Sequence, residues 1–201
     1  MVILEEIKLA LKTIKEFTKL NGIKLTPEIK IDYKLDSAGC TYWNWDGKSI
    51  YINPKICKTQ SKHKGHYDLG HLNSYDLTSI CLHEFGHLLM EKFGIHKDFI
   101  KTSPTIVNSN AAQSRLEEFA EIFTIFITNP YFLKILNEDC LNFLKERFKS
   151  PTSCSKKYFM KIYATWDDSL KKRTKDTLGI HVEKRKIIVN RSKVNRFLNK
   201  N

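Results

Sequence analysis

The residues best suited to chemistry in this sequence are His83, Glu84 and His87, which form the pattern His-Glu-x-x-His. Imidazoles four residues apart lie one turn apart on the same face of an α-helix, so both can bind one metal ion. Glu84 lies beside them, where its carboxylate could take a proton from a water molecule activated by the metal. The pattern therefore predicts a zinc site with Glu84 as general base. A surface helix with two solvated imidazoles is the alternative interpretation.

The surrounding segment has the periodicity of the helix that such a site needs, starting near Ser74 or Asp76 and ending at Phe93-Gly94. Helical geometry predicts one stripe that faces a cleft, made of Ile80, His83, Glu84, His87 and Glu91. It predicts an opposite stripe that faces the core, made of Leu82, Phe85, Leu89 and Phe93.

A catalytic zinc site needs a third protein ligand and an open position for water. Glu117 is the leading candidate, and Glu121 lies one turn further along the same predicted helix, which runs from Ser114 to about Thr128. Carboxylates on so apolar a helix need partners, because unpaired charge in a core is costly. A metal for Glu117 and a ligand imidazole for Glu121 would satisfy both. The expected buried face is Leu116, Phe119, Ala120, Phe123 and Phe126.

A second interpretation of Glu117 is purely structural. Ser114-x-x-Glu117 is a capping-box pattern, in which the glutamate carboxylate only accepts a hydrogen bond at the helix start. The two roles are hard to combine, because one carboxylate would have to face two directions.

These motifs together resemble a known group of enzymes. His-Glu-x-x-His with a downstream Glu-x-x-Ala-Glu resembles the gluzincin branch of zinc metallopeptidases. The string Glu117–Phe123, running on to Asn129-Pro130, is similar to peptidase domains of the anthrax lethal factor type and their small phage-associated relatives. The resemblance covers roughly residues 75–148 and suits a small upstream sheet. By position it implies zinc ligands His83, His87 and Glu117, general base Glu84 and an orienting Glu121.

The lethal-factor pattern differs from this chain at residue 110. It places a tyrosine seven residues before the ligand glutamate to stabilise the oxyanion, and this chain has Asn110. Asparagine can donate a hydrogen bond, but it is shorter and not acidic. Other candidates for oxyanion or substrate contacts are His66, Tyr67, His71, Tyr158 and His181.

A second resemblance is to the repressor-cleaving ImmA/IrrE type of metallopeptidase. Glu117, Ala120, Phe123 and Pro130 fall at matching positions. Both groups are zincins and differ in substrate and setting. The helix-turn-helix often attached to the second group is not evident in this sequence.

The rest of the chain predicts a single α+β domain over residues 1–170, with a small N-terminal sheet and a mostly helical second half. A first helix should end at Asn21-Gly22, and alternation from Ile29 to Leu35 predicts a strand. Asp46-Gly47 favours a hairpin whose aromatic residues either pack across the strands or flank an extended substrate. One further helix is expected from Pro130 to about Pro151, then a helical stretch over 155–178 and a short strand at 187–189.

The excess of positive charge lies at the C-terminus. The formal net charge is +12, and residues 171–201 hold eleven Lys or Arg against Asp176 and Glu183. We interpret this segment as a basic tail, either solvated and flexible or attracted non-specifically to nucleic acid or an acidic partner. Lysine predominates over arginine, which makes specific base recognition less favoured.

A histidine-rich loop and the spacing of the cysteines are relevant to a second metal site and to the cellular compartment. Cys57, His63, His66 and His71 match no standard zinc spacing, so solvated loop histidines are the favoured interpretation. Five irregularly spaced cysteines, no signal peptide and no apolar run long enough for a membrane span predict a reducing, cytoplasmic setting, including a host cytoplasm or virion. The expected partner is a protein or peptide substrate. The alternative is a non-catalytic, zinc-stabilised structural or nucleic-acid-associated protein of a phage or mobile element.

Overall fold

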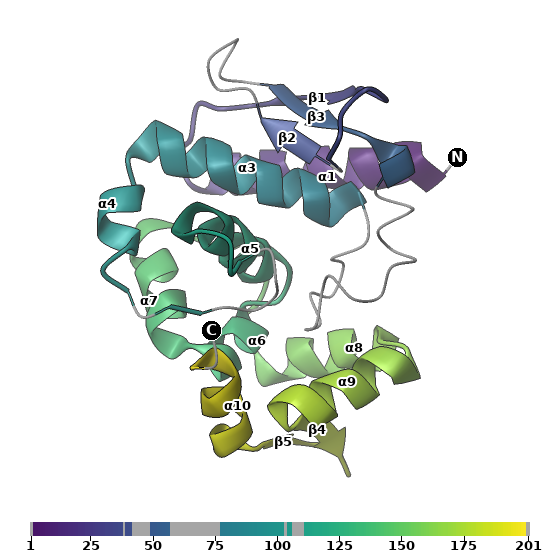
Figure 1. The fold of residues 1–201 in the computed structure, drawn as a ribbon, viewed down its shortest axis with the longest axis vertical. Helices are drawn as coiled ribbons and strands as arrows, with labels where there is room; N and C mark the ends of the chain where they lie inside the picture. The colour runs from purple at the N-terminus through teal and green to yellow at the C-terminus, as the bar shows by residue number, and fades with distance from the viewer. Residues whose placement is uncertain are drawn as a thin grey trace.

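The computed structural model describes residues 2–37, 39–41, 49–56, 77–102, 104–105 and 111–199. Its architecture is α+β, as predicted, with a small sheet near the N-terminus and a mostly helical second half (Figure 1). From the top of Figure 1 downward, the chain forms a sheet, a layer with α1 and α3, then α5, and finally the C-terminal helices. None of the helices in the described part of the chain has both the length and the apolar character needed to cross a bilayer.

The sheet consists of three short strands in the order β1-β3-β2, which confirms the predicted size. β1 (Glu28–Ile31) pairs in parallel with β3 (Ser49–Ile52), and β2 (Gly39–Thr41) pairs antiparallel with β3. The strand predicted to reach Leu35 stops at Ile31, because Asp32 turns the chain by accepting the Lys34 backbone N–H at 2.9 Å. The predicted turn at Asp46-Gly47 and the aromatic residues Tyr42, Trp43 and Trp45 lie outside the described residues, whereas Tyr51 lies in β3.

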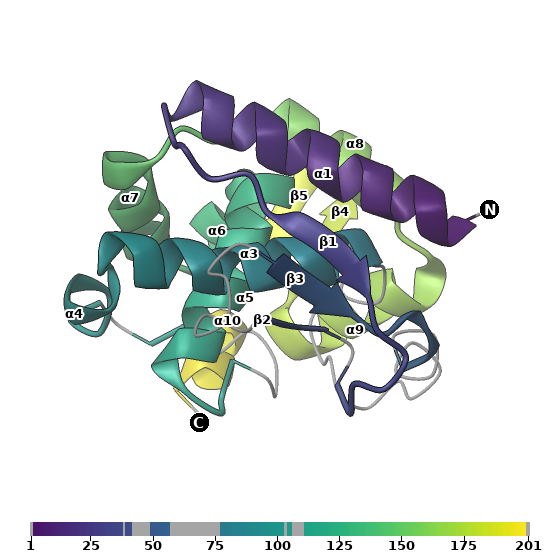
Figure 2. The ribbon, with the colours of Figure 1, turned by 90° about the horizontal axis from the view of Figure 1, so that it is seen from above.

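Two long helices support the sheet. α1 (Val2–Leu20) lies beside α3 (Leu77–Phe93), and Figure 2 shows α1 running along the β1 side of the sheet. The helical spacing predicted for α1 is confirmed, since Ile7, Ile14 and Phe17 are buried. Gly22 ends the helix as predicted, with a φ of +64° that an L-residue with a side chain rarely adopts.

The core is built where α1, α3 and α5 (Arg115–Thr128) meet. The rings of Phe17, Phe85 and Phe123, one from each helix, lie with centroids 5.2–6.0 Å apart in edge-to-face contacts. Edge-to-face aromatic packing fixes the relative rotation of helices as well as excluding water. This cluster therefore anchors the backs of the two helices that carry the candidate site residues.

The second half is more divided than predicted. After the short α4 (His96–Phe99) and α5, the single helix expected from Pro130 is two, α6 (Pro130–Leu136) and α7 (Glu138–Arg147). Asn137 breaks it, because its side chain accepts the backbone N–H groups of Asp139 and Cys140 and so caps a new helix. The predicted helical stretch 155–178 is also two helices, α8 (Lys156–Thr165) and α9 (Asp168–Leu178).

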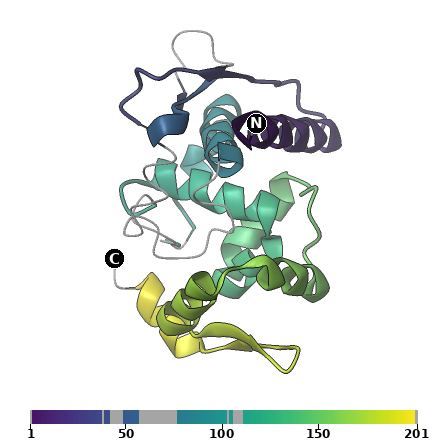
Figure 3. The same ribbon diagram turned by 90° about the vertical axis from the view of Figure 1, so that its right-hand side faces the viewer.

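The basic C-terminal segment is folded, so its interpretation as a flexible tail is wrong for residues 171–199. α9 is followed by a hairpin of β4 (Ile180–Glu183) and β5 (Lys186–Val189) and then by α10 (Arg191–Leu198), as Figure 3 shows. Leu178, Ile180 and Val194 are buried between these elements. The strand predicted at 187–189 is confirmed, whereas the predicted boundary at residue 170 falls inside α9.

Candidate metal centre

The His-Glu-x-x-His residues lie in the middle of α3. Its core-facing stripe is confirmed for Leu82, Phe85 and Leu89, each at most 1% exposed. Phe93 departs from that prediction at 47% exposed, because it lies at the last position before Gly94 ends the helix. His83 and His87 are partly buried on the other side of α3, whereas Glu84 is only 7% exposed.

α5 crosses α3 at two small residues. A Cβ on Gly86 would lie 3.1 Å from the Cα of Ala120, closer than almost all real contacts of that kind. Gly86 is one of the two unspecified positions of the His-Glu-x-x-His pattern, and Ala120 lies between Glu117 and Glu121. The close approach of the backbones therefore brings the two carboxylates of α5 up to the two imidazoles of α3.

Three side chains converge at this crossing. The Nε2 atoms of His83 and His87 are 3.1 Å apart. Glu117 reaches both rings, with Oε2 3.0 Å from His83 Nε2 and Oε1 3.4 Å from His87 Nε2. Within the described residues these three form a His-His-Glu group at metal-binding distance. The predicted convergence of Glu117 on the histidine pair is thus present in the structure.

The opposite nitrogen of His83 faces Glu121, as the predicted orienting role requires. Nδ1 of His83 lies 3.2 Å from Oε1 of Glu121, whose side chain is buried. A carboxylate at the second ring nitrogen favours the tautomer in which Nε2 is available as a metal donor. His83 is therefore held between one carboxylate on each ring nitrogen.

Burial and charge act against each other in this cluster. Burial alone lowers the pKa of His83, but the charge of Glu121 and hydrogen bonds with Glu117 and Glu121 raise it well above the ordinary value. Burial raises the pKa of Glu117, yet the two imidazoles outweigh burial and hold it well below its usual range. Burial also raises the pKa of Glu84, opposed by the charges of His83 and His87. Three carboxylates thus surround two imidazoles, an arrangement that a bound cation would balance.

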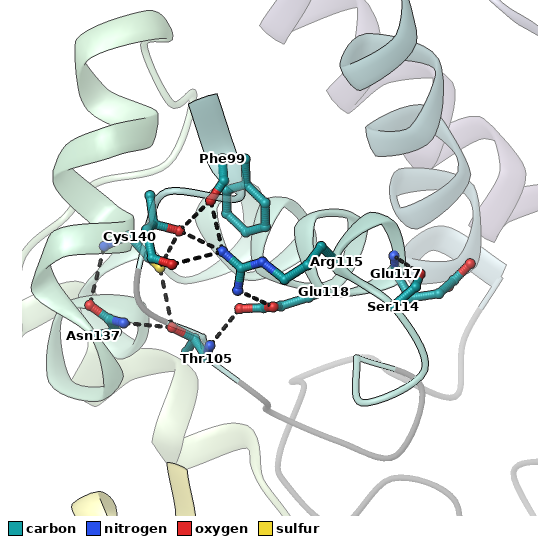
Figure 4. Close-up of polar contacts among 9 residues, drawn as sticks. Phe99, Thr105, Ser114, Arg115, Glu117, Glu118, Asn137 and Cys140 are labelled. Atoms are coloured by element: carbon teal, nitrogen blue, oxygen red, sulfur yellow. Dashed lines mark hydrogen bonds and ion pairs between the residues drawn. The ribbon is translucent and has the colours of Figure 1, made fainter. Parts of the chain in front are cut away.

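Of the capping-box alternative for Glu117, the structure shows the contribution of Ser114, while the Glu117 carboxylate lies against the two histidines. The Ser114 hydroxyl accepts the Glu117 backbone N–H at 3.2 Å, so serine caps the helix while the glutamate carboxylate points to α3 (Figure 4). Leu116, in the first turn of α5, is 45% exposed rather than buried as predicted. Phe119, Ala120, Phe123 and Phe126 are buried as predicted.

The residues predicted to contact the oxyanion or substrate are not found beside the three candidate ligands in the described part of the chain. Asn110, His66, Tyr67 and His71 lie outside the described residues, as do Cys57 and His63 of the second histidine cluster. His181 lies on β4 with Nε2 3.8 Å from Glu183, and Figures 1 and 3 show this hairpin at the far end of the molecule from the sheet. Tyr158 lies in the first turn of α8.

Sequence reasoning missed two features of the site. One is the Gly86–Ala120 crossing, whose only sequence signal is a small residue in each motif. The other is a partly buried ion pair of Arg115 with the buried Glu118, on the opposite side of α5 from Glu117 (Figure 4). Arginine and glutamate three residues apart are common on solvated helices, so their spacing gave no signal of burial.

Comparison with known proteins assigns the chain to no family. No protein-family model matches the chain, and no curated protein or solved structure matches it significantly. The resemblance to gluzincins accordingly rests on the residues of α3 and α5 quoted above.

Proposed function

We propose that the chain is a zinc-dependent endopeptidase, with His83, His87 and Glu117 as ligands and Glu84 as general base. The observation that carries the proposal is the meeting of three side chains from two helices. The two histidine Nε2 atoms lie 3.1 Å apart, and the two Glu117 carboxylate oxygens lie 3.0 and 3.4 Å from them. Two of the donors belong to rigidly spaced imidazoles, and the third comes from a separate helix.

The choice of zinc follows from the donor set and its size. Bonds of about 2.0–2.1 Å in a tetrahedron place neighbouring ligand atoms about 3.3–3.4 Å apart, close to the separations found here. Calcium prefers about six to eight oxygen ligands at longer distances, and magnesium keeps several waters in an octahedron. Two imidazoles and one carboxylate suit zinc better than either, and three protein ligands leave a position for solvent and substrate.

The roles of the surrounding residues follow from their chemistry. A zinc ion held here supplies a Lewis acid that polarises a peptide carbonyl and lowers the pKa of a water molecule. Glu84 accepts the proton of the attacking water and passes it to the leaving amine. Glu121 keeps the His83 ring in the orientation and tautomer that binding needs. The burial of Glu84 and Glu121 limits competing hydration of both carboxylates.

The decisive experiment separates chemistry from metal binding. Glu84→Gln should retain zinc and lose cleavage of a peptide library, because the amide cannot accept the proton. Glu146→Gln is the control, since Glu146 is an exposed glutamate on α7 and its substitution should leave both properties unchanged. Hydrolysis by a zinc-loaded Glu84→Gln protein at the wild-type rate would overturn the assigned role.

The second candidate is a metal site that serves folding alone, as in a structural component of a phage or mobile element. It is favoured by one observation, that the three candidate ligands link α3 to α5, two helices that pack against each other. Zinc-dependent stability without cleavage of any library peptide would select this candidate. We also propose a reducing, cytoplasmic setting, because the five cysteines of the sequence are irregularly spaced and form no Cys-x-x-Cys pair.

A further inference from the structure

The side of α5 opposite Glu117 carries a polar network in the first turn of the helix (Figure 4). Arg115 pairs through one guanidinium nitrogen with Glu118 Oε2. Its other terminal nitrogen donates to the Phe99 carbonyl at 2.7 Å and to the carbonyl and hydroxyl of Thr102, each at 2.9 Å. The guanidinium also stacks on the Phe99 ring, 4.5 Å from its centroid. One arginine thus joins the start of α5 to the end of α4.

Glu118 extends this network to α7. Its Oε1 accepts the backbone N–H of Thr105 at 2.5 Å. The Thr105 hydroxyl in turn accepts from Asn137 Nδ2 at 2.6 Å and lies 3.2 Å from the Cys140 sulfur. Asn137 caps α7, so the network links three helices through hydrogen bonds that point in fixed directions.

This network lies in the first turn of α5, where burial differs from one side chain to the next. The later turns carry buried residues such as Phe119 and Phe123, whereas Leu116 in the first turn is 45% exposed. The first turn of any helix also has backbone N–H groups without helical partners and tends to fray. Glu118 is only 1% exposed, so a charge is buried here with several compensating donors.

We propose that Arg115 and Glu118 are positioning residues for Glu117, and that their network sets the metal affinity of the centre. Glu117 lies between them in sequence, so fixing Arg115 and Glu118 on one side of the turn fixes the Glu117 carboxylate on the other. Metal–ligand distances tolerate errors of only about 0.2 Å, less than the displacement of a frayed turn. This inference rests on the proposed metal site.

The test measures zinc affinity by competition with a chromophoric chelator, together with the thermal midpoint of the zinc-free protein. Glu118→Gln and Arg115→Lys keep size and part of the hydrogen bonding, and Arg115→Met removes the guanidinium. Each should bind zinc about 10- to 100-fold more weakly, the range for residues that orient ligands, with Arg115→Lys retaining the most affinity. Arg147→Met is the matched control. Arg147, on α7, also stacks on an aromatic ring, that of Phe143, and it pairs with Asp98 on α4. This variant should bind zinc as wild type does.

A double-mutant cycle separates positioning from general destabilisation. In a Glu117→Gln background, Arg115→Met should cause little further loss of zinc affinity, because the carboxylate it positions is absent. Full additivity, or wild-type affinity in folded Arg115→Lys and Glu118→Gln, would overturn the inference. Failure of the wild-type protein to bind zinc would instead overturn the proposed function itself, so the two failures are distinguishable.

Discussion

The backbones of Gly86 and Ala120 approach so closely that a Cβ on Gly86 would lie 3.1 Å from the Ala120 Cα, a tighter contact than nine in ten of those that real Cβ atoms make. The contact lies where the histidine helix and the glutamate helix cross. It therefore sets the separation on which convergence of the ligands depends.

Gly86→Ala should push α3 and α5 apart by a few tenths of an ångström. Because the nearest atom is backbone, which cannot turn aside, we expect a loss of about 1–3 kcal/mol in the free energy of unfolding. Zinc affinity should fall as well, since His83 and His87 would move away from Glu117. Chemical denaturation and chelator competition measure the two effects. Unchanged values for both would show that the crossing does not control the site.

Glu121 should matter for metal binding although it is not a ligand. Glu121→Gln replaces the carboxylate that faces His83 Nδ1 at 3.2 Å, so the imidazole loses its charged partner. We expect zinc binding to weaken about 10- to 100-fold. Glu138→Gln, an exposed carboxylate on α7, is the control and should bind as wild type does. Equal affinities in the two variants would remove Glu121 from the site.

The sequence was enough to predict that the three candidate ligands meet, but not how the helices around them cross and end. His83, His87 and Glu117 were predictable because helical spacing fixes the first two and burial demands a partner for the third. The helix crossing was not, since it depends on contact between segments far apart in sequence. The helix break at Asn137 was not predicted because the helical spacing of apolar residues continues past it. Within residues 171–199, the helix to residue 178 and the strand at 187–189 were predicted, but β4 and α10 were missed because many charges surround the few buried residues Leu178, Ile180 and Val194.

Removing the metal should destabilise the wild-type protein. A ligand present at a free concentration of about 1,000 times its Kd raises the free energy of unfolding by about 4 kcal/mol. For a chain of this size, that increase raises Tm by roughly 8–16 °C. Thermal melts with and without a chelator measure the shift. His83→Ala should melt at the same temperature in both conditions. A wild-type Tm indifferent to chelation and to added zinc would contradict the prediction.

The basic hairpin tip is the place to test non-specific binding to nucleic acid. Lys184 and Arg185 are exposed and have φ values of +46° and +61°, a turn that favours Asn-Gly. Lys184→Asn with Arg185→Gly therefore removes two charges without straining the hairpin, whereas truncation at residue 170 would cut α9. If this surface binds phosphates, affinity for duplex DNA and its dependence on salt should both decrease. Identical salt dependence in the variant and the wild type would show that the hairpin tip does not contact the DNA phosphates.

Metal binding by His83, His87 and Glu117 is tested most directly by the metal content of the purified protein after dialysis, measured by elemental mass spectrometry. We expect about one zinc ion per wild-type chain, with strong depletion in separate His83→Ala, His87→Ala and Glu117→Gln variants that remain folded. A wild-type protein without bound zinc after incubation with it, or variants that retain the full amount, would contradict the account.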